Sequence, residues 1–137
     1  TAYIYLCYGL HQMFNVVTNE PGVPHAVLLR AIEPLGGLKY MQQRTGKEMN
    51  DAGMGRGPGN LGKAMGIHTG LSGISLTGSR IYIADDGWKP ATGEIGISPR
   101  IGVAYAGPDA DLPYRFFIRD HPCVSGPHST KTKKLIA

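Results

Sequence analysis

The residues best suited to chemistry in this chain are the tyrosines of one short segment near its beginning. Tyr3, Tyr5 and Tyr8 lie within residues 2–9, where apolar and aromatic residues alternate until Gly9. In an extended strand Tyr3 and Tyr5 share one face, and Gly9 marks the turn where Tyr8 projects. Phenol rings on a strand face, next to a projecting ring, are suited to stacking on nucleic-acid bases.

Two polar side chains interrupt apolar segments further along. Asn15 follows an apolar run, and Arg30 lies within residues 27–32, which are otherwise apolar. A buried amide costs free energy unless it is hydrogen-bonded, and a buried cation unless it is paired. Asn15 is therefore either an amide at a turn or strand end, or a ligand-binding group. Arg30 either pairs with Glu33, extends to solvent or serves a site.

A third candidate is a glycine-rich loop before a predicted helix. Gly57, Pro58, Gly59 and Asn60 form it, and Lys63 follows one turn later. The beginning of a helix offers free backbone N–H groups and the positive end of the helix dipole to an anion. We expect a phosphate contact at this loop; the alternative is an ordinary glycine-rich helix start.

Turn-forming residues, with 20 glycines and 10 prolines, divide the chain into short elements that must position these side chains. The spacing of apolar residues predicts helices at 36–44 and 57–66, and strands at 2–8, 11–18, 26–32, 80–84, 100–105 and 114–119. We expect one domain over residues 1–125. Residues 126–137 contain three lysines without apolar periodicity, and we expect a disordered basic tail.

The composition narrows the class of partner. A net charge of +4 favours a polyanion. The five histidines and two cysteines are scattered, so we expect reduced thiols, no metal site and no cofactor. No stretch approaches the roughly 20 apolar residues of a membrane span, and no signal-peptide pattern opens the chain. We therefore expect a cytoplasmic, nucleoid-associated protein that is not secreted and contacts no membrane.

The segments that carry these candidates resemble the alkyladenine (3-methyladenine) DNA glycosylase family. The matching blocks follow in order at residues 3–9 with Asn15, 27–35, 57–61 with 64–67, 98–102 with 105–107, and 113–116 with 122–125. The resemblance thus covers residues 3 to 125. It implies a mixed α/β (α+β) fold, a single domain with a curved, mainly antiparallel sheet, a protruding β-hairpin and short helices.

The resemblance also implies roles for the candidates. Tyr8, with Gly9 at the hairpin tip, would be the wedge that fills the space left by an extruded base. Tyr5 would stack on that base, Asn15 would exclude the amino group of guanine, and Arg30 would support catalysis near the water and a DNA phosphate. The glycine-rich loop would contact DNA. Against these roles, Tyr8 could pack on its own strands, and Tyr5 in the core.

The reaction implied by the family is hydrolysis of the N-glycosidic bond of alkylated or deaminated purines in double-stranded DNA. A monofunctional glycosylase of base excision repair does this with a glutamate-activated water and no metal. The family's glutamate motif precedes the hairpin, and none of the ten acidic residues stands in that context. We therefore expect a monomeric C-terminal portion, truncated at its N-terminus and inactive alone. The alternative is a non-catalytic nucleic-acid-binding module.

Overall fold

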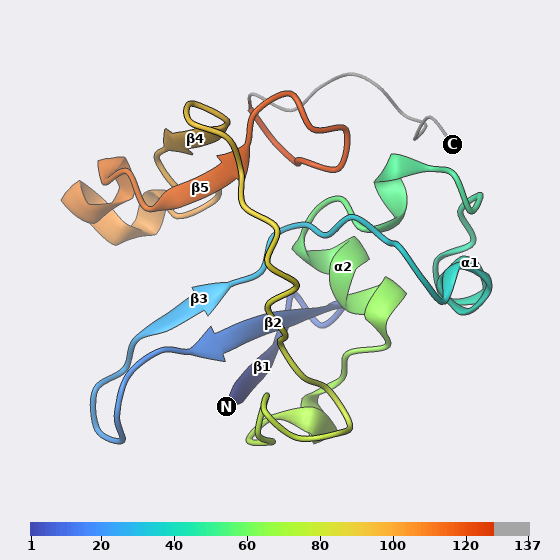
Figure 1. The fold of residues 1–137 in the computed structure, drawn as a ribbon. Coiled ribbons are helices and arrows are strands. Elements are labelled where there is room, and N and C mark those ends of the chain that lie inside the picture. The colour runs from blue at the N-terminus through green and yellow to red at the C-terminus, as the bar shows by residue number, and fades with distance from the viewer. Residues whose placement is uncertain (128–137) are drawn as a thin grey trace.

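The computed structural model describes residues 1–127, and the predicted tail lies outside them from residue 128 onward. The strands are β1 (Ala2–Cys7), β2 (His11–Val17), β3 (Ala26–Leu28), β4 (Ile95–Ser98) and β5 (Arg115–Ile118). The helices are α1 (Leu38–Thr45) and α2 (Pro58–Met65), with 3-10 helices η1 (Ala52–Met54), η2 (Thr69–Leu71) and η3 (Ala104–Asp111). The mixed α/β class with antiparallel pairing is confirmed (Figure 1). The described strands form two sheets, β1-β2-β3 and β4-β5, where one curved sheet was expected.

The predicted hairpin is present. β1 and β2 pair antiparallel with Tyr3 opposite Asn15 and Ile4 opposite Phe14. Tyr8 and Gly9 both have positive φ, 51° and 68°, which matches the type I′ turn that suits the twist of paired strands. Because side chains alternate along a strand, Ile4 and Phe14 enter the core, where each is at most 4% exposed.

The core lies between this hairpin and α2. Ala2, Ile4 and Phe14 are packed in one cluster with Leu61 of α2 and with Ile67, Leu71 and Leu76, which follow α2 in the chain. The helix approaches β2 closely through glycines. A methyl group added at Gly62 would meet the carbonyl oxygen of Gln12. The close contact with the backbone of β2 therefore fixes the position of α2 and of the loop at its N-terminus.

The close approach at Gly62 gives a testable stability prediction. We expect Gly62→Ala to lower the free energy of unfolding by about 1–3 kcal/mol, because the added methyl meets backbone that cannot move aside. Urea unfolding of the variant measures this loss. Gly36→Ala is the matched control, since an added methyl there has no atom within 4 Å. An unchanged Gly62→Ala midpoint would show that the helix and β2 can separate at little cost.

The segment that carries Arg30 is not a continuous strand, so the predicted strand at 26–32 was too long. β3 ends at Leu28, and the Leu29 N–H donates to the Phe14 carbonyl at 3.0 Å. The chain then leaves β2. Ala31 forms an isolated bridge with Arg56, and the Ile32 N–H donates to the Gly55 carbonyl at 3.1 Å. Residues 29–33 thus connect the first sheet to the loop before α2.

Glycines mark the ends of both α-helices. α1 and α2 end at Gly46 and Gly66, both with positive φ, as a helix-ending glycine allows.

The predicted strand at 80–84 was wrong, since only an isolated bridge between Thr77 and Tyr82 occurs there. The predicted strand at 100–105 was also wrong, because Gly102 turns the chain into η3. The strand at 114–119 is confirmed as β5, whereas its partner β4 was not predicted. No described helix is both long and apolar enough to cross a membrane.

Candidate functional site

A groove of about 1150 Å³ is lined by residues of both sheets. Its lining comes from β3 with residues 29–33, from the β4-β5 sheet with residues 121 and 123–125, and from Tyr5 of β1 and Asn15 of β2. This volume exceeds the roughly 300–1,000 Å³ of pockets for small molecules. The groove can therefore admit part of a larger ligand.

Three candidates from separate parts of the sequence, Tyr5, Asn15 and Arg30, line this groove together. Tyr5 lies on β1 and is 38% exposed, with its ring centroid 5.6 Å from that of Tyr3. Burial raises the pKa of the Tyr5 phenol, and nearby Cys7, Tyr105 and Tyr3 raise it further. Tyr5 thus presents a neutral ring on the groove rather than in the core.

Asn15 is nearly buried within β2, so it is not an amide at a turn or strand end. It is 7% exposed, and its Nδ2 donates to the carbonyl oxygens of Tyr3 at 3.2 Å and Met13 at 3.3 Å. Both amide hydrogens are therefore engaged by the main chain. The side chain is fixed against the groove, which is what a group that excludes a ligand by its position requires.

Arg30 is half-buried and does not pair with Glu33. Burial lowers the pKa of its guanidinium, and its Nε is buried without a hydrogen-bond partner among residues 1–127. Within the same residues, the Glu33 carboxylate instead lies against the His121 ring, with 3.6 Å between Oε1 and Nε2. No carboxylate of residues 1–127 therefore neutralises the cation of Arg30 on the groove wall.

Arg115 is a second cation of the groove and was not among the residues predicted for the site. It is 5% exposed, and its guanidinium donates to Ser98 Oγ at 3.1 Å, the Ser125 carbonyl at 2.6 Å and the Pro127 carbonyl at 3.1 Å. Burial lowers the pKa of Arg115, and the charge of Arg30 lowers it further. The two cations therefore lie near each other and make this part of the groove attractive to an anion. The signal in the sequence that could have identified this residue was an arginine at the beginning of an otherwise apolar strand.

The candidates for DNA contact lie on a different surface, formed by the hairpin tip and the start of α2. Tyr8 is 92% exposed, so its ring does not pack on its own strands. A methyl group added at Gly59 would lie 2.7 Å from His11 Nδ1, which places the α2 loop beside the tip. The absence of a side chain at Gly59 permits this close approach, and its backbone N–H in the first turn of α2 stays a candidate for the predicted phosphate contact.

At the beginning of α2 no side chain caps the helix. Gly57 has a φ of 91°, and Pro58 occupies the first turn. The Asn60 amide donates to the Arg56 carbonyl at 2.9 Å, so this side chain is partly occupied within the loop. Lys63 is exposed one turn later. The backbone N–H groups and Lys63 are the parts of this loop suited to an anion.

Several exposed aromatic side chains of the groove were not predicted as candidates. Trp88, Tyr105, Tyr114 and Phe116 all line it and are 61% exposed or more. They come from separate loops and strands, so no local spacing in the sequence brought them together. Their rings enlarge the aromatic surface that Tyr5 begins.

The thiol of Cys123 is a poor nucleophile here. Cys7 and Cys123 are both free, and Cys123 is 3% exposed. Burial and the charge of Glu33 raise the pKa of Cys123, with Arg56 opposing them. The described part of the chain contains no group of three or more histidine, cysteine, aspartate or glutamate side chains placed to hold a metal ion.

Comparison with known proteins gives one consistent family. The model of the methylpurine-DNA glycosylase family matches residues 1–122. The DNA-3-methyladenine glycosylase of Arabidopsis thaliana is 36% identical over 130 residues, which cover 94% of this chain and 51% of that protein. A protein of Methanocella arvoryzae is 43% identical over 90% of this chain and 61% of its own length. Its name assigns it provisionally as a 3-methyladenine DNA glycosylase. The chain spans about half to two thirds of these relatives.

Proposed function

The chain belongs to the methylpurine-DNA glycosylase family, and we propose that the whole protein hydrolyses the N-glycosidic bond of alkylated or deaminated purines in double-stranded DNA. One observation carries this proposal. Tyr5, Asn15 and Arg30 are distant in sequence, and the fold brings them to one groove. In this proposal the groove receives the extruded base, and the protein acts as a monomer in DNA repair.

The groove offers a physical route to selecting damaged bases. An enzyme that acts on a base within a duplex must extrude it, at a cost of a few kcal/mol. The exposed Tyr5 ring would stack on that base. A purine that carries a positive charge after alkylation gains cation–π attraction there, which a normal base does not. The fixed Asn15 amide would exclude guanine by crowding its exocyclic amino group.

Contacts with the DNA backbone complete the proposal. Arg30 would bind the phosphate of the extruded nucleotide, because its guanidinium has no carboxylate partner among residues 1–127. Tyr8 would enter the base stack from the hairpin tip, next to Gly9. The loop of Gly57, Pro58, Gly59 and Asn60, with Lys63 one turn later, would hold a neighbouring phosphate, since this loop lies beside that tip.

The water-activating carboxylate is the one part for which residues 1–127 offer no suitable group. Glu33 and Asp86 are the carboxylates that line the groove. The Glu33 carboxylate lies 3.6 Å from His121 Nε2, and Asp86 accepts the Trp88 N–H at 2.9 Å. We propose that this carboxylate comes from a part of the whole protein outside these 137 residues.

We therefore expect the 137-residue chain to release no base from duplexes that contain 3-methyladenine or hypoxanthine. The assay is single-turnover release with protein in excess, and the control is binding of the same protein to a duplex with an abasic-site analogue. Release that Glu33→Gln or Asp86→Asn abolishes would contradict the assignment of the missing group. No preference for the abasic analogue over intact duplex would instead favour a general nucleic-acid-binding module.

A further inference from the structure

Glu33 and Arg30 line the same groove but do not pair. They are three residues apart and carry opposite charges on a partly buried wall. Arg30 is half-buried and the Glu33 side chain is 47% exposed, so these opposite charges attract each other with screening by water only partly reduced. Even so, no carboxylate of residues 1–127 is within ion-pair distance of Arg30, and the Glu33 carboxylate lies 3.6 Å from His121.

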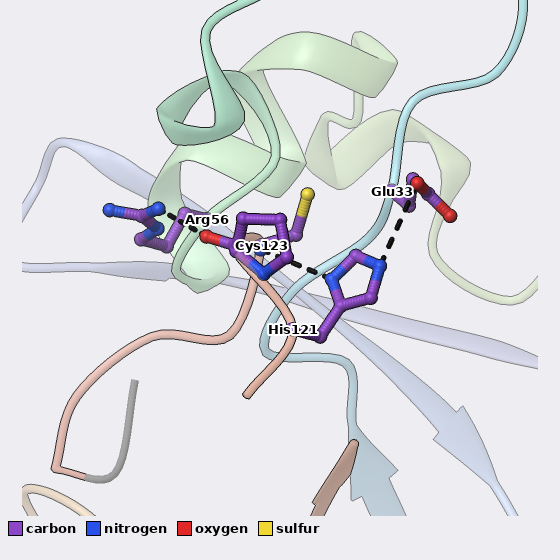
Figure 2. A network of polar contacts seen from close by, with 5 residues as sticks. Glu33, Arg56, His121 and Cys123 are labelled. Atoms are coloured by element: carbon purple, nitrogen blue, oxygen red, sulfur yellow. Dashed lines mark hydrogen bonds and ion pairs between the residues drawn. The ribbon is translucent and has the colours of Figure 1, made fainter. Parts of the chain in front are cut away.

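The His121 ring is held in place from both sides (Figure 2). The Cys123 N–H donates to His121 Nδ1 at 3.2 Å. A neutral imidazole that accepts at Nδ1 carries its hydrogen on Nε2, the atom that faces Glu33. Arg56 donates to the carbonyl of Pro122, between the two residues, and so fixes the same segment. His121 is therefore preset to attract the carboxylate.

We propose that His121 is a positioning residue that holds the Glu33 carboxylate away from Arg30, and so keeps the Arg30 guanidinium open to a DNA phosphate. This rests on the proposed function, in which Arg30 binds phosphate. Without the imidazole, Glu33 is free to turn along the wall toward Arg30. The resulting ion pair neutralises the cation and places a carboxylate where the phosphate must approach.

This role makes a prediction that a merely structural role does not. If His121 acts by controlling Glu33, then removing the charge of Glu33 must repair the loss of His121. If His121 only stabilises the segment around Cys123, a second substitution at Glu33 removes one more contact and repairs nothing. The double variant therefore separates the two explanations.

The experiment measures affinity for a fluorescein-labelled duplex that contains an abasic-site analogue, at constant ionic strength. We expect His121→Ala to bind about tenfold more weakly, the loss for one charge-assisted contact. His121→Ala with Glu33→Gln should return to within about twofold of the unmodified chain. Asp86→Asn in the His121→Ala background is the matched control: it removes another carboxylate of the groove and should not restore binding.

Two further measurements make each outcome decisive. Arg30→Gln tests the proposed function itself: unchanged affinity would remove Arg30 from phosphate binding whatever His121 does. If Arg30→Gln weakens binding but the double variant is not restored, or Asp86→Asn restores it equally, the positioning role is wrong.

In the free protein, the NMR signal of Arg30 Nε–H should shift in His121→Ala and shift back with Glu33→Gln. A signal that never moves would overturn the proposal without any DNA.

Discussion

Replacing Tyr8 with alanine is expected to weaken binding to a duplex with an abasic-site analogue by about five- to hundredfold, the range for losing one aromatic stacking contact. The side chain is 92% exposed at the hairpin tip, so it contributes little to the core. Tyrosine and alanine also share the cost of the positive φ of 51° at this position. The melting temperature should therefore stay nearly constant while the affinity falls.

Tyr40→Ala is the matched control for this experiment. Tyr40 is 66% exposed on α1 and is not among the residues of the groove. Its loss removes a similar ring from a different surface and should leave the affinity unchanged. If Tyr8→Ala instead lowered the melting temperature and kept the affinity, the ring would have a structural role in the hairpin.

The elements predicted well from the sequence are those whose signals are local. The alternation before Gly9 predicted the hairpin, and the Gly57-Pro58 start with the Gly66 end predicted α2 to within one residue. β4 was missed because it has only four residues, including a glycine, and sixteen residues separate it from its partner β5. The predicted strand at 26–32 was too long because only Arg30 interrupts its apolar run, whereas Ala31 and Ile32 pair with the loop before α2.

The same limit applies to the site. Tyr5, Asn15 and Arg30 were recognised through the family resemblance, and the structure places all three on one groove; their roles stay predictions. The pair of Glu33 and His121 could not be foreseen, since the two residues are 88 positions apart and nothing in their local sequence connects them. Such long-range polar contacts depend on how the segment that contains His121 lies against the groove, and no local periodicity of the sequence encodes that placement.

Asn15→Asp should be the most destabilising of the substitutions considered, by about 3–5 kcal/mol at pH 7.5, the usual cost of an uncompensated buried charge. The amide donates to the carbonyls of Tyr3 and Met13. A carboxylate has no hydrogen to donate, so two oxygens would face two oxygens at a position that is 7% exposed. Urea unfolding measures the loss. Asn50→Asp, at an exposed position, is the control and should change stability by less than about 0.5 kcal/mol.

The pH dependence of Asn15→Asp separates this explanation from a simple loss of packing. Burial and the two carbonyls raise the pKa of the introduced carboxyl in the folded protein above its unfolded value of about 3.9. The folded state then holds the proton more tightly, so the variant loses stability relative to the unmodified chain as the pH rises above about 4. The charges of Arg30 and Arg115 act in the opposite direction, but neither guanidinium is hydrogen-bonded to Asn15, whereas both carbonyls contact it directly. We therefore expect a smaller deficit at pH 4 than at pH 7.5. A deficit that shrinks with rising pH would show that the two arginines, and not the carbonyls, dominate the potential at Asn15.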